Sequence, residues 1–314
     1  MKLSDIVSYR NKIREYDLDP HIVDAVRYFN DIEHYVSSHY LQFANNSENL
    51  KQNLQSVITS INNFNHDLAE LEQHLTGVIE SKEPEYYAES TRRYELEMIH
   101  DTPEWILNRK LPITDDDRIR LQGRLKLYTD WRLPGMIIRP GNEKFIEDLV
   151  PLDPLYLVDH DQQLLDPAMN QFLPEYQRRL RPYVVKELPN EPILGKLPDN
   201  QFGFIFAYNF FNFKPMEVVQ RWLNECYSKL RPGGVMIFTF NDCDFDTCIR
   251  STEQYYQTFT PGREVKNAIF RAGFEINYEW MKGSEVSWLE VKKLGEITSL
   301  RGGQSLAKIV ARPK

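Results

Sequence analysis

The sequence predicts a long α-helical coiled-coil region followed by an α/β domain with a doubly wound, mostly parallel seven-stranded sheet. Two apolar runs, Phe204–Tyr208 and Val235–Phe240, predict the sheet, since parallel strands covered on both faces are apolar throughout. Between them, apolar residues recur at helical spacing from Met216 to Leu230. The three segments together predict one β–α–β unit, and a heptad repeat nearer the N-terminus predicts the coiled coil.

The heptad repeat comes first along the chain. Apolar residues follow one another at spacings of four and three over residues 22–78, and only Glu33 and Ser47 interrupt the series. A strict 3.5-residue repeat of this length is typical of coiled coils. We therefore expect a homo-oligomer that assembles through residues 22–78. The alternative is an antiparallel hairpin within one chain, broken near residues 45–47.

The heptad repeat and the strand pattern divide the chain into three regions. We expect a coiled-coil oligomerisation region at residues 1–80, a helical connecting segment at 81–134 and the α/β domain at 135–314. Prolines punctuate the connecting segment. Within it, Thr114 followed by three aspartates predicts a helix start, because carboxylates favour the positive N-terminal end of a helix.

Seven strands and the helices between them account for the third region. The predicted strands are Met136–Ile138, Leu155–Val158, Tyr183–Val185, Phe204–Tyr208, Val235–Phe240, Phe274–Trp280 and Ser305–Val310. We expect the last two to close the sheet as a hairpin. A helix is predicted to begin at Thr260–Pro261 and to end at Gly273, since proline suits a first helical position and glycine suits a left-handed cap.

Composition excludes several classes of protein. The chain has 314 residues and a formal net charge of −8, which argues against a nucleic-acid partner because such partners need local positive potential. Its three cysteines, Cys226, Cys243 and Cys248, predict neither a disulfide framework nor a metal site. No apolar stretch approaches the roughly 18 residues of a membrane span. We therefore expect a cytoplasmic protein without a membrane partner.

Four places in the third region resemble a known family. They are the turn Leu197–Phe202, the turn Leu230–Gly234, the helix segment from Thr260 to Phe274, and Asp159 at the end of a predicted strand. In this order and spacing they resemble the class I S-adenosylmethionine-dependent methyltransferases, over residues 135–314. The resemblance implies a Rossmann-like methyltransferase fold, S-adenosylmethionine as cofactor, and a small-molecule or protein methyl acceptor.

The resemblance also implies roles for residues at the ends of the first two strands. Asp159 would accept hydrogen bonds from the two ribose hydroxyls of the cofactor, at the carboxyl edge where such sheets bind ligands. Gly141 and Asn142 would frame its methionine end. The corresponding loop of the family carries several glycines, whereas here Arg139 and Glu143 flank Gly141. This departure supports the alternative function, a non-catalytic assembly protein that retains the fold.

Further roles fall on the ends of the third and fourth strands. Glu191 would face the adenine amino group, and Tyr208 and Asn209 would border the transferring methyl group. Tyr208 can equally be a core residue. Acceptor contacts are expected in residues 241–256, which are rich in aspartate and tyrosine. The sequence names no catalytic base for proton removal from the acceptor.

Overall fold

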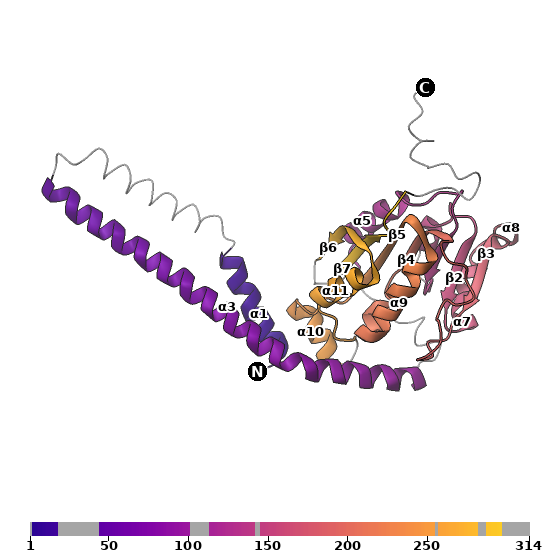
Figure 1. The fold of residues 1–314 in the computed structure, drawn as a ribbon, viewed down its shortest axis with the longest axis horizontal. Helices are drawn as coiled ribbons and strands as arrows, with labels where there is room; N and C mark the ends of the chain where they lie inside the picture. Colours follow the sequence, from indigo (N-terminus) through magenta and orange to yellow (C-terminus); the bar gives the residue numbers. More distant parts are fainter. Residues whose placement is uncertain are drawn as a thin grey trace, which may run out of the picture. The chain divides into compact units, whose positions relative to one another are not determined.

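The computed structural model describes residues 2–17, 44–100, 113–141, 145–254, 257–281 and 287–296. The chain divides into two compact units, residues 1–85 and 86–314, and Figure 1 shows the helices and strands of each. Within the described residues, no helix combines the length and the apolar character that crossing a membrane requires.

The first unit contains α1 (Leu3–Asp17) and the first part of α3 (Ala44–His100). The Nε of Arg14 on α1 lies 2.6 Å from the Oε1 of Glu72 on α3. On α3, the heptad residues Phe64 and Leu71 are 55% and 46% exposed. The heptad positions in residues 22–43 lie outside the described residues, and the coiled coil stays a prediction.

The second unit is built on a seven-stranded sheet in the order β3-β2-β1-β4-β5-β7-β6. The strands are β1 Gly135–Ile138, β2 Leu155–Asp159, β3 Leu180–Val184, β4 Phe202–Ala207, β5 Leu230–Phe240, β6 Glu275–Trp280 and β7 Ser287–Lys292. Strands β1 to β5 run parallel to their neighbours, while β7 is antiparallel to both β5 and β6. The sheet is therefore mixed, with its first five strands parallel as the sequence predicts.

Helices cover both faces of this sheet (Figure 1). The helices of the second unit, besides the end of α3, are α5 Asp115–Lys126, α6 Phe145–Asp148, α7 Gln162–Asn170, α8 Pro174–Gln177, the 3₁₀ turn η1 Phe211–Phe213, α9 Met216–Lys229, α10 Asp246–Glu253 and α11 Gly262–Ala272. One core cluster packs α9 and α11 on the sheet, and the other packs α5, α6 and α7. Each cluster buries one side of the apolar strands, as their unbroken apolar pattern requires.

Several local predictions are confirmed. The side chain of Thr114 accepts a hydrogen bond from the N–H of Asp117 at the start of α5. Gly273 ends α11 with a φ of 94°, in the left-handed region that glycine adopts freely. The cysteines are free.

Other predictions need correction. Strand β3 begins at Leu180 rather than at Tyr183, and the predicted turn at residues 230–234 lies within β5, where the register with β4 shifts. The N-cap of α11 is Pro261, so proline precedes the helix instead of opening it. The hairpin partner of β6 is β7, whereas Ser305–Val310 lies outside the described residues.

Candidate functional site

The candidate site is the carboxyl edge of the sheet around β1. Strand β1 pairs with β2 on one side and β4 on the other, so the chain leaves these three parallel strands at one edge. The strand order reverses here, and this is the place where open α/β sheets bind ligands. The residues at the ends of the three strands are Arg139–Gly141 after β1, Asp159–His160 at the end of β2 and Tyr208–Asn209 after β4.

The turn after β1 has an unusual backbone. Arg139 has a φ of 55° and Gly141 a φ of 51°. Glycine adopts this region freely, whereas for arginine it is uncommon and is often found at functional sites. The side chain of Arg139 is only 10% exposed. Asn142, a predicted site residue, and Glu143, which flanks the predicted loop, lie outside the described residues.

Asp159, at the end of β2, has a fully buried carboxylate. Its Oδ1 accepts a hydrogen bond of 2.8 Å from the backbone N–H of His160, and its Oδ2 lies 3.7 Å from the Nε of Arg139. Burial raises the pKa of Asp159, but the charge of Arg139 and the hydrogen bonds from His160 outweigh burial and hold it below its ordinary value. Asp159 is therefore an ionised acceptor group inside the protein.

Asn209 and Tyr208 follow β4 and are both buried. The backbone N–H of Asn209 donates to the Oγ1 of Thr239 at 2.7 Å, and its φ is 50°. The side-chain oxygen of Asn209 has no hydrogen-bond partner among the described residues. The ring of Tyr208 packs against that of Phe145, with 4.8 Å between the centroids, so Tyr208 contributes to the core as well as to this edge.

Glu187, beyond the end of β3, is a buried acid that sequence reasoning missed. Its carboxylate accepts from the Nζ of Lys214 at 2.7 Å, from the Nε1 of Trp222 at 2.6 Å and from the hydroxyl of Tyr94. Burial raises the pKa of Glu187, but Lys214 and the hydrogen bonds lower it to about 2. The predicted residue Glu191 is exposed instead.

The last turns of α3 pack on the same edge, since they contact residues that follow β3 and β5. Ser90 accepts from the N–H of Phe259 at 2.8 Å, and Arg93 donates to the carbonyl of Thr252 at 2.6 Å. A narrow pocket between this helix and the sheet edge is lined by Arg93, Tyr94, Phe213, Gln257 and Thr258. The segment before the predicted α/β domain therefore contributes to the site.

Asp242, just after β5, is a third buried carboxylate at this edge. Its Oδ1 accepts hydrogen bonds from the N–H of Gly262 at 2.9 Å and from that of Asp244 at 3.0 Å. Burial and the nearby charge of Asp244 raise the pKa of Asp242 to about 7. A carboxyl group with this pKa can take up or release a proton near neutral pH.

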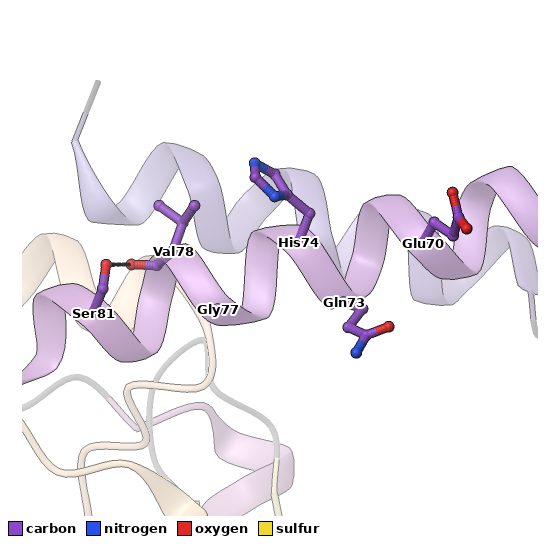
Figure 2. A pocket seen from close by; sticks show the side chains of 6 residues that line it. All are labelled: Glu70, Gln73, His74, Gly77, Val78 and Ser81. Carbon is purple, nitrogen blue, oxygen red and sulfur yellow. Dashed lines mark hydrogen bonds between the residues drawn. The ribbon is translucent and has the colours of Figure 1, made fainter.

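A further groove lies along α3 in the first unit, and Figure 2 shows the side chains beside it. It is lined by Glu70, Gln73, His74, Gly77, Val78 and Ser81, all from this one helix. Among the described residues, no group of three or more histidines, cysteines or acids could hold a metal ion. The groove therefore offers no metal centre, and the sheet edge stays the candidate site.

No protein-family model and no curated protein matches the sequence. The solved structures similar to the chain include the N-methyltransferase NodS from Bradyrhizobium japonicum WM9 in complex with S-adenosyl-L-homocysteine (14% identity, TM-score 0.45, covering 61% of this chain and 96% of that one). They also include a putative sarcosine dimethylglycine methyltransferase from Galdieria sulphuraria (11%, 0.46, 57% and 87%). A third is the geranyl diphosphate C-methyltransferase from Streptomyces coelicolor A3(2) in complex with Mg²⁺, geranyl diphosphate and S-adenosyl-L-homocysteine (7%, 0.46, 57% and 80%).

Proposed function

We propose that the second unit is an S-adenosylmethionine-dependent methyltransferase. Two features of the chain support the proposal: the sequence motifs that resemble the class I family, and a sheet whose five parallel strands and antiparallel β7 fit the Rossmann-like fold that the resemblance implies. The proposal places the S-adenosyl ligand at the ends of β1, β2 and β4, with Asp159 on the ribose.

The observation that carries the proposal is a pair of buried acceptors without donors. The Oδ2 of Asp159 and the Oδ1 of Asn209 have no hydrogen-bond partner among the described residues. An unsatisfied buried acceptor costs about 1–3 kcal/mol, so both atoms suit a ligand that brings donors. Asp159 ends β2 and Asn209 follows β4, and these two strands lie on either side of β1. The ribose hydroxyls and the amino groups of an S-adenosyl ligand are such donors.

The chain's own residues fit the chemistry of this ligand. When bound, S-adenosylmethionine supplies an electrophilic methyl group, and the protein's main task is to position the acceptor in line with it. Asp159 would orient the ribose and Asn209 a donor beside the reacting end. Asp242, whose pKa is about 7, is the residue that we propose takes a proton from the acceptor near neutral pH. With Asp244 and Asp246 close in sequence, the segment favours an amine or cationic acceptor, either a small molecule or a protein.

Calorimetric titration with S-adenosylmethionine and S-adenosylhomocysteine tests the proposal. We expect both to bind the wild-type protein, and Asp159→Ala to weaken binding by about 10- to 100-fold, because hydrogen bonds to a charged group are worth about 1.5–3 kcal/mol. Asp166→Ala is the control, since Asp166 is an exposed acid on α7 that accepts a hydrogen bond from the side chain of Gln162. Absence of heat with the wild-type protein at millimolar ligand would instead support a scaffold without this chemistry.

We propose further that the first unit assembles the protein as a homo-oligomer. The support is the heptad register of residues 22–78 and the exposure of its seam at Phe64 and Leu71. The double variant Phe64→Asp/Leu71→Asp should reduce the mass measured by light scattering to that of one chain. The control is Asn63→Asp/Gln73→Glu, which adds the same charge at exposed polar positions of α3. A wild-type protein with the mass of one chain would contradict the assembly.

A further inference from the structure

Arg139 is a cationic side chain beside the proposed ribose site. It follows β1, and its side chain reaches sideways to the residues that follow both neighbouring strands. The Nη2 lies 3.3 Å from the Nδ1 of His160, and the guanidinium carbon lies 5.3 Å from the ring centre of Phe210. Its Nε faces the Oδ2 of Asp159 at 3.7 Å. The guanidinium thus lies between the ends of β2 and β4, where the proposed ligand would bind.

The ion pair between Arg139 and Asp159 is poorly formed. A separation of 3.7 Å is too long for a hydrogen bond, and both the Nε and the Oδ2 are buried without another partner among the described residues. Elsewhere in the second unit, Arg124 on α5 donates two hydrogen bonds of 2.9 Å to Glu290 on β7. The chain can therefore form a close two-pronged pair, and the pair at Asp159 falls short of one.

His160 explains part of this poor fit. Its Nδ1 lies 2.8 Å from the Oδ1 of Asp159 and 3.3 Å from the Nη2 of Arg139. One ring nitrogen cannot donate to the carboxylate and accept from the guanidinium at the same time. The imidazole and the guanidinium therefore compete for position around one carboxylate, and the guanidinium makes the longer contact with it.

We propose that Arg139 sets the affinity of the site by occupying the carboxylate of Asp159, so that an S-adenosyl ligand binds only by displacing the guanidinium. This inference rests on the function proposed above. The ribose diol would replace a cation at a buried carboxylate, and part of the binding free energy is spent on separating the two charges. Without Arg139, the Oδ2 of Asp159 would lose its guanidinium neighbour, and the diol would satisfy that oxygen directly.

The decisive variant is Arg139→Gln, which shortens the side chain and removes its charge. We expect it to bind S-adenosylhomocysteine at least 10-fold more tightly than the wild-type protein in calorimetry at pH 8, where Asp159 stays ionised. The control is Arg179→Gln, since Arg179 pairs with Asp153 at 3.3 Å and follows α8 before β3, away from the ends of β1 and β4. This control should leave the affinity unchanged.

A second variant and a second measurement distinguish a change in ligand affinity from a loss of folding. Arg139→Lys keeps the charge but not the reach, and we expect a smaller gain in affinity. The rise in melting temperature on adding S-adenosylhomocysteine should follow the same order, largest for Arg139→Gln. Equal or weaker binding by both variants would overturn this inference and leave the proposed function standing. No binding by the wild-type protein or by either variant would overturn both.

Discussion

Two buried aspartates at the same edge of the sheet have pKa values that are shifted in opposite directions. Asp159 ends β2 and Asp242 follows β5, and both are almost fully buried, with exposures of 2% and 1%. Burial raises the pKa of each, yet the pKa of Asp159 ends below its ordinary value, whereas that of Asp242 rises to about 7. Arg139 beside the first and Asp244 beside the second account for the difference. Burial alone therefore does not set the charge; the nearest ionic neighbour does.

The comparison assigns different tasks to the two ends of the edge. A carboxylate whose pKa is held below its ordinary value, such as that of Asp159, suits hydrogen-bond donors of a ligand. A carboxyl group that titrates near neutrality, such as Asp242, suits proton transfer. Glu187 belongs with Asp159, because its pKa is lowered to about 2 beside Lys214. The buried carboxylates near the ends of β2 and β3 thus lie beside cations, whereas the buried carboxylate after β5 lies beside another acid.

The largest expected effect on stability comes from removing the cation that pairs with Glu187, so that burial raises the pKa of this acid as it raises that of Asp242. Lys214→Met removes the cation and leaves the buried Glu187 with hydrogen bonds alone, so the free energy of unfolding should fall by about 3–5 kcal/mol at pH 7.5. Urea denaturation measures the loss. The double variant Lys214→Met/Glu187→Gln should recover much of it, because no uncompensated charge remains.

An exposed ion pair provides the scale for this loss. Arg250 pairs with Asp246 at 3.0 Å, and the arginine side chain is 54% exposed. Arg250→Gln should cost less than about 1 kcal/mol, since solvent screens exposed pairs. A loss of the same size for Lys214→Met would show that the buried pair does not hold Glu187 in its ionised form.

The next effect is a change in the pH dependence of stability at Asp242. Its folded pKa of about 7 lies above the ordinary value of 3.8, so the folded state binds the proton more tightly than the unfolded state. Stability from this group is complete below about pH 4 and is lost as the pH rises toward 7. Relative to Asp242→Asn, the wild-type protein should lose about 2–3 kcal/mol between pH 5 and pH 8.

Urea denaturation at four pH values between 5 and 8 measures this difference. Asp244→Asn is a graded control, because removing the neighbouring charge should lower the pKa of Asp242 and reduce the slope without abolishing it. Parallel stability profiles for the wild-type protein and Asp242→Asn would contradict the titration of Asp242 near neutrality.

The sheet was largely predictable from sequence because its central strands are buried on both faces. Strands β4 and β5 contain apolar runs that local composition identifies without knowledge of their partners. Strand β7 escaped prediction since it carries Glu290, a charge at a fully buried position. Its burial depends on Arg124, 166 positions away in the chain, and no local pattern reveals such a partner.

The site shows the same limit. Asp159 was predictable because its place follows from the end of an apolar strand. Glu187 was not, since Lys214, Trp222 and Tyr94 come from distant segments and only together make a buried acid at that position tolerable. Arg139 was recognised as a departure from the family's glycine-rich loop, but its contact with Asp159 required the folded chain. The heptad seam stays a prediction.

The smallest expected effect on stability tests the backbone N–H groups that donate hydrogen bonds to Asp242. A methyl group at Gly262 would lie 2.8 Å from the Oδ2 of Asp242 and 2.8 Å from the Cε of Met281. Gly262→Ala should therefore push the carboxylate from its N–H donors and lower the free energy of unfolding by about 1–2 kcal/mol. In contrast, Gly123 on α5 has no atom within 4 Å of such a methyl group. Gly123→Ala should raise the free energy of unfolding by about 0.5–1 kcal/mol through helix propensity alone. Changes of opposite sign in the free energy of unfolding, measured by urea denaturation, would separate crowding at Asp242 from a general effect of glycine replacement.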